Sequence, residues 1–491
     1  MPINYEELKA LLFQNKGVKQ VIIKNTFWLS MTEAFNKILK LFLVIYIARV
    51  LGAVGYGEFN FALAFASLFI IFTDFGIPVL ATRELAKDKE KEKHFPALLA
   101  LKLLLTAAVF VLTLAVGFFT IKDPIIRELI FVFALMIASH SLIEIVFVFF
   151  RARQKMEYEA WIKIIEVAIN AALGFFVLFN FPSPVNLSWA YSFAAIIALV
   201  ASLVFLRVKF IPLKLEINLR VWKEYFLIAW PLALVGFFTL IYTQTDSVMM
   251  GFFKLIKEVG WYSAALKIVG ASLIPAGLVS QCFFPALASA LKHPERLQKI
   301  WNYFLQIMIF FAVPVMVGGI ILAQKIIDFV YDPSYFPAIL AFQILILTTG
   351  INYLCTPFNQ LLIVLNQQKK MFWAILGGAL INVILNSILI PRFTLYGAAA
   401  ATVISMIFIF SFLIRLTFKS APIKSIIGPQ IIFTFVASLL ASLPMYFAIS
   451  RPMIYSLNIF LSILIGALVY AAVFSVFYFF FSRAGKGRAE E

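Results

Sequence analysis

Long apolar runs constrain the fold of this chain more than any other feature of its sequence. About fourteen runs of about 20 residues or more are apolar enough to cross a bilayer, whose hydrocarbon core is about 30 Å thick. They lie near residues 25–49, 56–80, 97–119, 126–150, 160–180, 187–207, 224–250, 259–285, 300–323, 336–362, 371–390, 396–417, 427–449 and 455–482. Because a backbone in lipid must satisfy its own hydrogen bonds, these runs predict an all-α polytopic membrane protein.

The composition excludes the soluble classes of protein. Of the 491 residues, 63% are hydrophobic and only 13% are charged, whereas soluble domains are about 45–50% apolar and about 25% charged. A membrane β-barrel is also excluded, because its strands would appear as short segments of alternating hydrophobicity.

The net charge of +17 is concentrated in alternate connections between the apolar runs. The basic connections include residues 83–93, 151–155, 207–223, 292–299, 369–370 and 415–424. The connections between them are poor in charge, with Lys254 and Lys257 as the exception. Because cytoplasmic loops carry the excess of Lys and Arg, we expect an even number of spans and both termini in the cytoplasm. The basic residues therefore indicate topology, and nucleic acid is not an expected partner.

A repeated motif predicts the domain organisation. YGEFNFALAFASLF at 56–69 resembles VGWYSAALKIVGASL at 259–273, about 203 residues later. Six spans restore the starting orientation, so we expect two parallel six-span lobes, which are typical of transporters. The expected parts are a cytoplasmic amphipathic segment at 1–24, an N-lobe at 25–210, a C-lobe at 211–420, two further helices at 421–482 and a cytoplasmic tail at 483–491. No connection has room for a soluble domain, and no Gly-rich phosphate loop indicates nucleotide-driven pumping.

The first span, NTFWLSMTEAFNKILKLFLVIYIAR, carries charged residues inside its apolar run. Glu33, Lys37 and Lys40 follow a spacing of i, i+4 and i+7, which places them on one helical face. A charge at the bilayer centre costs about 3 kcal/mol on insertion scales. We therefore expect this face to line a watery cavity.

Further ionisable residues lie in the first two spans of each predicted repeat, namely Asp74, Asp246 and Lys267. Our hypothesis is that Lys37, Lys40 and Lys267 bind an anionic head group such as a diphosphate. Glu33, Asp74 and Asp246 are then cavity acids that could couple transport to Na⁺ or H⁺. The alternative is that the acids neutralise the lysines, by pairs such as Glu33–Lys37 and Asp246–Lys267. Secondary candidates are Arg49, His140, Glu144, Glu166, Asn382 and Asn386.

Other polar residues carry simpler interpretations. Lys102, Lys163 and Arg49 lie close enough to a membrane interface for their charged groups to reach water along the surface. Cys282 and Cys355 lie in apolar runs, and we interpret them as small buried hydrophobic residues. The three histidines are scattered without Cys or His ligand spacing, so neither a metal site, a cofactor nor a catalytic residue is expected.

Several longer stretches carry a family resemblance. They are YIARVLGAVGYGEFNFALAFASLF (46–69), DFGIPVLATRELAKD (74–88), DSVMMGFFKLIKEVGWYSAALKI (246–268) and PFNQLLIVLNQQKKMFWAILGGALINVILNSILIPRFTLYGAAAATV (357–403). The chain resembles Wzx-type polysaccharide-biosynthesis flippases of the multidrug/oligosaccharidyl-lipid/polysaccharide (MOP) exporter superfamily. The resemblance implies two six-helix lobes of a MATE-like fold with alternating access, in a prokaryotic cell membrane.

The resemblance also implies an activity. Such flippases move a polyprenyl-(pyro)phosphate-linked oligosaccharide from the cytoplasmic to the outer leaflet, without covalent chemistry. Basic cavity residues, matched here by Lys37, Lys40 and Lys267, would hold the pyrophosphate, and membrane lipid and polysaccharide polymerase or assembly proteins would be partners. Lipid II flippases similar to this chain rely largely on arginines. The lysine-based set disfavours lipid II as the substrate.

Three other functions remain open at this point. A cation-coupled multidrug exporter of the same fold would have a cavity of net negative charge. Lys37, Lys40 and Lys267 argue against this function. A membrane glycosyltransferase or ligase would need catalytic acids or metal ligands beside an extramembrane domain. A scaffold in a polysaccharide-assembly complex would tolerate the loss of every cavity charge.

Overall fold

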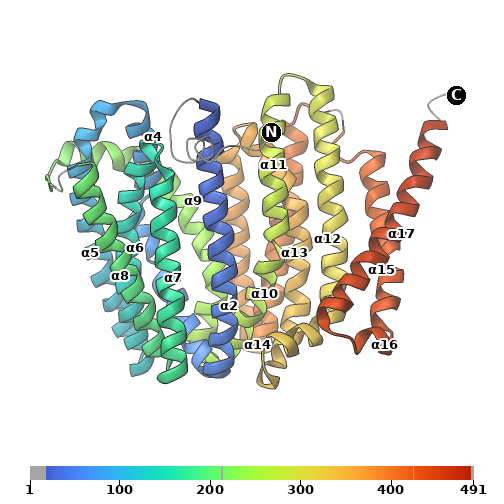
Figure 1. Cartoon of the computed structure of the whole chain (residues 1–491), viewed down its shortest axis with the longest axis horizontal. Coiled ribbons are helices and arrows are strands. Elements are labelled where there is room, and N and C mark those ends of the chain that lie inside the picture. The colour runs from blue at the N-terminus through green and yellow to red at the C-terminus, as the bar shows by residue number, and fades with distance from the viewer. Residues whose placement is uncertain (1–17, 212–213, 424, 488–491) are drawn as a thin grey trace, which may run out of the picture. The chain divides into compact units, whose positions relative to one another are not determined.

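The computed structural model describes residues 18–211, 214–423 and 425–487, and these contain helices and connections but no strand (Figure 1). Twelve helical segments in this part of the chain are long and apolar enough to cross a membrane. Two of them, Phe35–Lys87 and Gln368–Ser420, are 53 residues long. At 1.5 Å per residue, each would measure about 80 Å if it were straight, far more than the hydrocarbon core of about 30 Å.

Both of these long segments are broken. Within α2 (Val18–Ser67), Gly52 has φ 65° and ψ 179°. Within α14 (Gln368–Ser420), Thr394 has φ 51° and ψ −128°. Each break divides its segment into two lengths, so the described residues provide fourteen helical lengths for crossing a membrane. The predicted all-α polytopic fold class is confirmed.

The chain divides into two compact units, Met1–Gln244 and Thr245–Glu491. It passes from one to the other within α9 (Leu219–Phe252). The first half of α9 belongs to the core of the first unit, where Val221, Tyr225 and Ala229 are buried. The helix α9 therefore contributes residues to both units.

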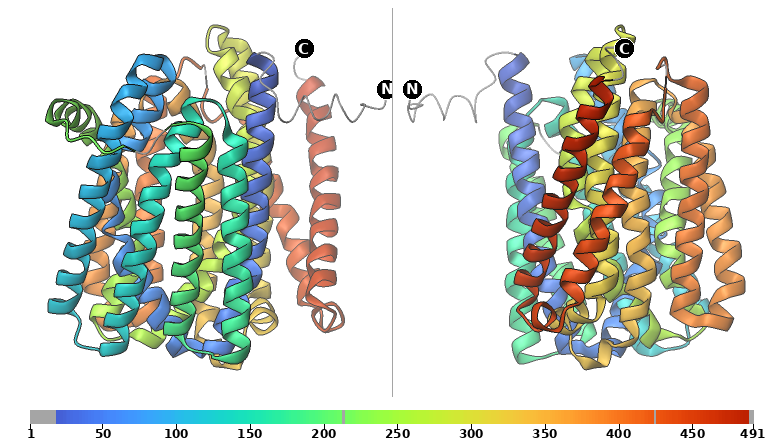
Figure 2. Two further views of the ribbon diagram at one scale, coloured as in Figure 1. Left: turned by 60° about the vertical axis from the view of Figure 1, so that its left-hand side comes forward. Right: turned by 90° about the vertical axis from the view of Figure 1, so that its right-hand side faces the viewer.

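The first unit is a helical bundle with α6 at its centre. Its elements are α2, α3 (Ile70–Asp74), α4 (Ile77–Lys87), the 3-10 helix η1 (Lys89–His94), α5 (Phe95–Thr120), α6 (Pro124–Ala152), α7 (Met156–Asn180) and α8 (Pro184–Lys209). Figure 2 shows α5 to α8 as adjacent rods, and α6 packs against α2, α5, α7 and α8. The residues of α6 are mostly buried, which fits this central position.

The second span is interrupted where α3 ends. Phe75 and Gly76 have φ values of 44° and 72°, in the left-handed region that favours glycine. A Cβ at Gly76 would lie 2.8 Å from Leu232 Cβ and 2.9 Å from the carbonyl oxygen of Ala229, both in α9. Gly76 is therefore required by the backbone turn and by the close approach of α9.

The second unit is built around α13. Its further elements are α10 (Ile256–Ser272), α11 (Ile274–Ala290), α12 (Pro294–Val330), η2 (Pro333–Tyr335), α13 (Pro337–Val364), α14, α15 (Pro429–Ser450), α16 (Pro452–Tyr455) and α17 (Ile459–Gly487). The two added helices α15 and α17 lie side by side (Figure 2, right panel). They pack on α12 through a core of Leu322, Ala441, Met445, Ile449 and Tyr470.

The sequence repeat has a structural counterpart. The second span of each repeat breaks in a similar backbone conformation, at Phe69 (φ −87°, ψ −12°) and at Leu273 (φ −84°, ψ −10°). The separation of these residues is close to the offset predicted from the sequence. The second span is thus interrupted at corresponding positions of the two repeats.

Candidate functional site

A buried carboxylate, Asp246 of α9, organises the polar interior of the second unit. Its side chain is 4% exposed and accepts hydrogen bonds from four side chains. Thr402 Oγ1 lies 2.6 Å from Oδ2, and the hydroxyl of Tyr262 donates to the same oxygen. Asn386 Nδ2 lies 2.6 Å and Asn382 Nδ2 lies 3.2 Å from Oδ1.

The break in α14 brings three of these donors to Asp246. Asn382 and Asn386 are one turn apart in the first half of α14, and Thr402 lies in the second half. The break at Thr394 reverses the chain between them, so both halves reach the same carboxylate. Asn386 Nδ2 also donates to Asn382 Oδ1 at 3.0 Å. Asn386 Oδ1 is buried and has no hydrogen-bond partner among the described residues.

All four groups that donate to Asp246 are neutral. A buried carboxylate without such donors is very costly, and these hydrogen bonds offset part of that cost. The cluster also gathers carboxylate, amide and hydroxyl oxygens around one point. Oxygen atoms of these kinds are the ligands of hard cations, and a carboxylate also accepts a proton.

The structure places the candidate basic residues in both units. Lys37, Lys40 and Arg49 are exposed on α2 of the first unit, and Lys267 is exposed on α10 of the second. The backbone of Glu33 belongs to α2, but its side chain lies outside the described residues. Each of the three lysines is thus accessible within a membrane-crossing helix.

Asp74 is paired with Lys102, and the interpretation of Lys102 as an interfacial residue is wrong. The side chain of Lys102 is fully buried, and its Nζ donates to Asp74 Oδ1 and, at 2.9 Å, to the carbonyl oxygen of Thr73. The ammonium group stays inside because it neutralises Asp74 and caps the carboxyl end of α3.

A row of charges joins the C-terminal half of α6 to the N-terminal half of α7. Arg151 donates to both carboxylate oxygens of Glu159 at 2.7 Å and to Glu144 at 2.5 Å. Lys163 lies 2.8 Å from Glu159. We call these four residues the charged seam. Because every member has an oppositely charged partner, the seam links the two helices without leaving an isolated charge.

Deeper along the same two helices, His140 Nε2 lies 2.6 Å from Glu166 Oε1. The side chain of His140 is 38% exposed and that of Glu166 is 15% exposed. Two of the secondary candidates are thereby brought together, while Glu144 belongs to the charged seam.

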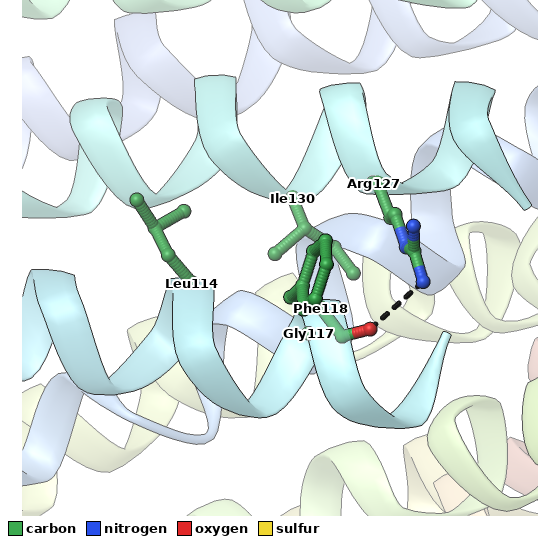
Figure 3. A pocket seen from close by; sticks show the side chains of 5 residues that line it. All are labelled: Leu114, Gly117, Phe118, Arg127 and Ile130. Atoms are coloured by element: carbon green, nitrogen blue, oxygen red, sulfur yellow. Dashed lines mark hydrogen bonds between the residues drawn. The ribbon is translucent and has the colours of Figure 1, made fainter. Parts of the chain in front are cut away.

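A small cavity of about 200 Å³ lies between the last turns of α5 and the first turns of α6 (Figure 3). Its walls are apolar apart from Arg127. The guanidinium of Arg127 donates to the carbonyl oxygens of Phe118 and Ile121, at 2.8 Å and 2.5 Å, and lies 4.6 Å from the ring centroid of Phe118. This charge caps the end of α5, and none of the predicted site residues lines the cavity.

Sequence reasoning missed Tyr262 and Thr402 as partners of Asp246. Both hydroxyls lie in stretches rich in small apolar residues, YSAAL and AAAAT. The position of a hydroxyl group within an apolar run was the one feature of the sequence that could have indicated these partners. The rotation and register of neighbouring helices decide which hydroxyl meets the carboxylate, and these depend on packing.

Comparison with known proteins relates part of the sequence to one family and to one curated relative. The sequence profile of a family described as "Polysaccharide biosynthesis protein" matches residues 22–291, more than half of the chain. The "Probable flippase AglR" of Haloferax volcanii is 28% identical over 242 residues, which cover 47% of this chain and 50% of the relative. The match thus spans about half the length of that curated relative.

Solved structures share the fold. A structure of the lipid II flippase MurJ, in an inward closed conformation, has a TM-score of 0.76 at 18% identity and covers 93% of this chain and 98% of its own. An inward-facing multidrug resistance MATE family transporter of the MOP superfamily has a TM-score of 0.64 at 13% identity, with coverages of 78% and 94%. A MOP superfamily transporter from Pyrococcus furiosus, described by the reverse polarity of its binding pocket, has a TM-score of 0.52 at 13% identity, with coverages of 83% and 97%. These likenesses confirm the predicted MATE-like fold.

Proposed function

The chain belongs to the polysaccharide biosynthesis protein family, and from this premise we propose that it is a flippase for polyprenyl-(pyro)phosphate-linked oligosaccharides. It moves the head group from the cytoplasmic to the outer leaflet of a prokaryotic cell membrane by alternating access. The observation that carries the proposal is the exposure of Lys37, Lys40 and Lys267 within membrane-crossing helices. A lysine in such a position is costly unless water and an anion meet it.

The lysines bind the pyrophosphate in this proposal. An ammonium group is a mobile point charge with three donors, so several lysines can follow a diphosphate as it turns. The prenyl chain stays in lipid, because each CH₂ group favours an apolar environment by about 0.8 kcal/mol. No bond is made or broken, so the protein acts as a transporter and not as an enzyme.

The cluster around Asp246 is the proposed coupling site for Na⁺ or H⁺. The buried Asn386 Oδ1, which lacks a partner among the described residues, adds an oxygen to those of Asp246 and Thr402. These residues therefore fit a small cation. A bound cation or proton would supply the charge that the four neutral donors do not.

We propose the topology and partners that this direction of transport requires. Both termini lie in the cytoplasm, as the basic connections indicate. Enzymes that assemble the lipid-linked sugar act before the flippase, and polymerases or other assembly proteins on the outer face act after it. Membrane lipid surrounds the many exposed apolar side chains, such as Phe119 and Met453.

The direct test is transport by the full-length protein in proteoliposomes. A fluorescent polyprenyl-diphosphate oligosaccharide is placed in both leaflets, and its loss from the inner leaflet is followed with a membrane-impermeant quencher. We expect exchange between the leaflets at a rate well above that of empty liposomes. Export of a cationic dye with no exchange of the diphosphate lipid would instead identify a multidrug exporter, the second function open to this fold.

A further inference from the structure

The cavity between α5 and α6 lies where these two membrane-crossing helices meet at their short connection. Helix α5 ends at Thr120 and α6 begins at Pro124, so the cavity is at the end of both crossings. Apart from Arg127, the side chains that line it are apolar (Figure 3). Phe118, one of these, is 60% exposed, and the next residue, Phe119, is 83% exposed. Because such side chains contact lipid in a membrane, the cavity borders on the hydrocarbon chains of the bilayer.

The packing of α5 on α6 leaves this cavity open beside a glycine. Gly117 of α5 is buried, and a Cβ at this position would lie 3.2 Å from Cγ2 of Ile130 on α6. Leu114 is half-buried and lies at the end of the cavity away from Arg127 (Figure 3). A larger side chain at position 114 would fill the space. The native residues leave it free for a length of hydrocarbon chain.

The guanidinium of Arg127 retains donors for a ligand. An arginine has five N–H groups. Nε of Arg127 donates to the carbonyl oxygen of Ile121, and Nη2 donates to that of Phe118. The remaining N–H groups, including both on Nη1, have no partner among the described residues. The ring of Phe118, 4.6 Å from the guanidinium carbon, helps to hold the group in place. The guanidinium is therefore positioned by the protein but only partly satisfied by it.

Arg127 also lacks a counter-ion. It is half-buried, and it forms no salt bridge with a described side chain. The acids closest to it along the chain, Asp123 and Glu128, are exposed. The carboxylate of Asp123 accepts hydrogen bonds from the backbone N–H groups of Ile125 and Ile126 instead. A half-buried cation without a carboxylate partner is stabilised by an anion from outside the protein.

The depth of Arg127 matches that of lipid phosphate groups. It lies three residues after Pro124, about 4.5 Å along α6 from the end of the helix. The polar headgroup region of a bilayer is about 5–7 Å thick on each side. A guanidinium binds phosphate oxygens through two parallel N–H donors, and basic pockets between membrane helices bind anionic lipid headgroups in this way. The cavity beside Arg127 then accommodates hydrocarbon attached to the same phosphate.

We propose that this cavity binds an anionic phospholipid of the surrounding membrane. Its phosphate accepts hydrogen bonds from Arg127, and the first part of one acyl chain lies against Leu114 and Ile130, between α5 and α6. The lipid ties the end of α5 to the start of α6 and satisfies donors that the protein leaves free. This site goes beyond the proposed flippase function and does not depend on it, because the lipid is a resident ligand that is not transported.

The expected selectivity follows from the charge of the headgroup. One basic residue near a membrane surface favours an anionic lipid by about fivefold in affinity. Phosphatidylglycerol carries a net negative charge, whereas the choline group of phosphatidylcholine brings a cation toward Arg127 and the exposed Lys122. We therefore expect the delipidated protein to bind phosphatidylglycerol about fivefold more tightly than phosphatidylcholine.

The first test measures binding of phosphatidylglycerol to the full-length, delipidated protein by native mass spectrometry. Arg127→Gln should weaken binding by about fivefold. Arg127→Lys should recover part of this loss, since lysine keeps the charge but not the planar fork. The matched control is Lys122→Gln, which removes the same charge from the adjoining connection without altering the lining of the cavity, and it should keep the wild-type affinity. Equal affinities of the wild type and Arg127→Gln for phosphatidylglycerol, or equal affinities of the wild type for the two lipids, would overturn the proposal.

The second test locates the lipid while leaving Arg127, which also caps α5, in place. Phosphatidylglycerol with a photoreactive group early in one acyl chain is cross-linked to the full-length protein, and the labelled peptides are mapped. We expect label near Leu114 and Ile130 and its loss in Leu114→Trp, whose side chain would fill the cavity. Leu112→Trp, at an exposed position of the same helix, should keep the label. Label that persists in Leu114→Trp, or that is spread evenly over the lipid-exposed helices, would overturn the proposal.

Competition distinguishes this lipid from a prenyl diphosphate, which offers similar phosphate chemistry. An equimolar amount of farnesyl diphosphate should leave the cross-link of phosphatidylglycerol unchanged. Displacement of phosphatidylglycerol by farnesyl diphosphate would assign the cavity to the proposed transport substrate and would overturn the resident lipid.

Discussion

Among single residues, Asp246 and Lys102 are buried charges that the structure compensates in two different ways. Asp246 is surrounded by neutral donors, whereas Lys102 has the opposite charge of Asp74. A group that must bind and release a cation is better served by neutral neighbours, because a fixed lysine would compete with the cation. The difference supports the coupling role proposed for Asp246, and it gives Lys102 a structural role as the partner of Asp74.

Asp246→Asn should abolish ion dependence while preserving the fold. The amide has nearly the same shape, but it removes the charge that attracts a cation. We expect the stimulation of lipid flipping by a Na⁺ or H⁺ gradient to fall by at least about tenfold, equivalent to about 1.4 kcal/mol. The matched control is Asp332→Asn, which changes a helix-capping carboxylate outside the spans. Full stimulation in Asp246→Asn would exclude this residue as the coupling site.

Lys102→Met should destabilise the first unit. The substitution leaves Asp74 without its buried partner, and breaking such pairs costs about 3–5 kcal/mol. We expect the free energy of unfolding in detergent to fall by about 3 kcal/mol. Adding Asp74→Asn should recover most of the loss, since no unpaired charge remains. A double variant no more stable than Lys102→Met would show that the pair is not the source of the effect.

At the scale of elements, the second span of each repeat is a broken helix, and the first unit has an additional break at Phe75 and Gly76. The ammonium of Lys102 caps the end of α3 beside this break, and α9 packs closely against it. The bend is therefore held by side-chain and backbone contacts.

Gly76→Ala should destabilise the protein, and Gly270→Ala should not. Alanine at position 76 would adopt a left-handed conformation and place its Cβ 2.8 Å from Leu232 Cβ. We expect a loss of about 1–3 kcal/mol in the free energy of unfolding. A Cβ at Gly270 would have no neighbour within 4 Å, so that variant should match or slightly exceed the wild type. Equal stabilities of the two variants would refute a requirement for glycine at position 76.

The elements were more predictable than the contacts between them. A lipid-embedded backbone must be helical, so the apolar runs alone predict fourteen crossings, including the two pairs joined in α2 and α14. Asn382 and Asn386 were secondary candidates, and the structure brings both to Asp246. Helix rotation is fixed by packing, which is why the partnership of Lys102 with Asp74 escaped prediction.

At the scale of the whole molecule, two compact units with matching second-span breaks carry the proposed transport. The membrane-crossing part of the first unit holds the His140–Glu166 pair, and that of the second holds the cluster around Asp246. The direction of transport depends on which ends of the helices face the cytoplasm.

Cysteine labelling tests this orientation. The described cysteines are free, and Cys282 is exposed whereas Cys355 is buried. The Cys282→Ser substitution therefore removes the exposed thiol that would otherwise react with the labelling reagent. We expect an impermeant maleimide to label Pro182→Cys in intact cells and Lys292→Cys only after permeabilisation, because basic connections stay in the cytoplasm. The opposite pattern would reverse the proposed topology.

The central claim is that exposed lysines carry an anionic lipid head group across the membrane. It is tested most directly by the rate of polyprenyl-diphosphate oligosaccharide exchange in proteoliposomes, comparing the wild type with Lys37→Ala/Lys40→Ala/Lys267→Ala. The control is Lys254→Ala/Lys257→Ala, which removes lysines of the outer connection and the start of α10. We predict that the triple variant folds but loses at least about 90% of the exchange, about 1.4 kcal/mol in activation free energy, while the control keeps it. Equal exchange by the wild type and the triple variant would contradict the claim.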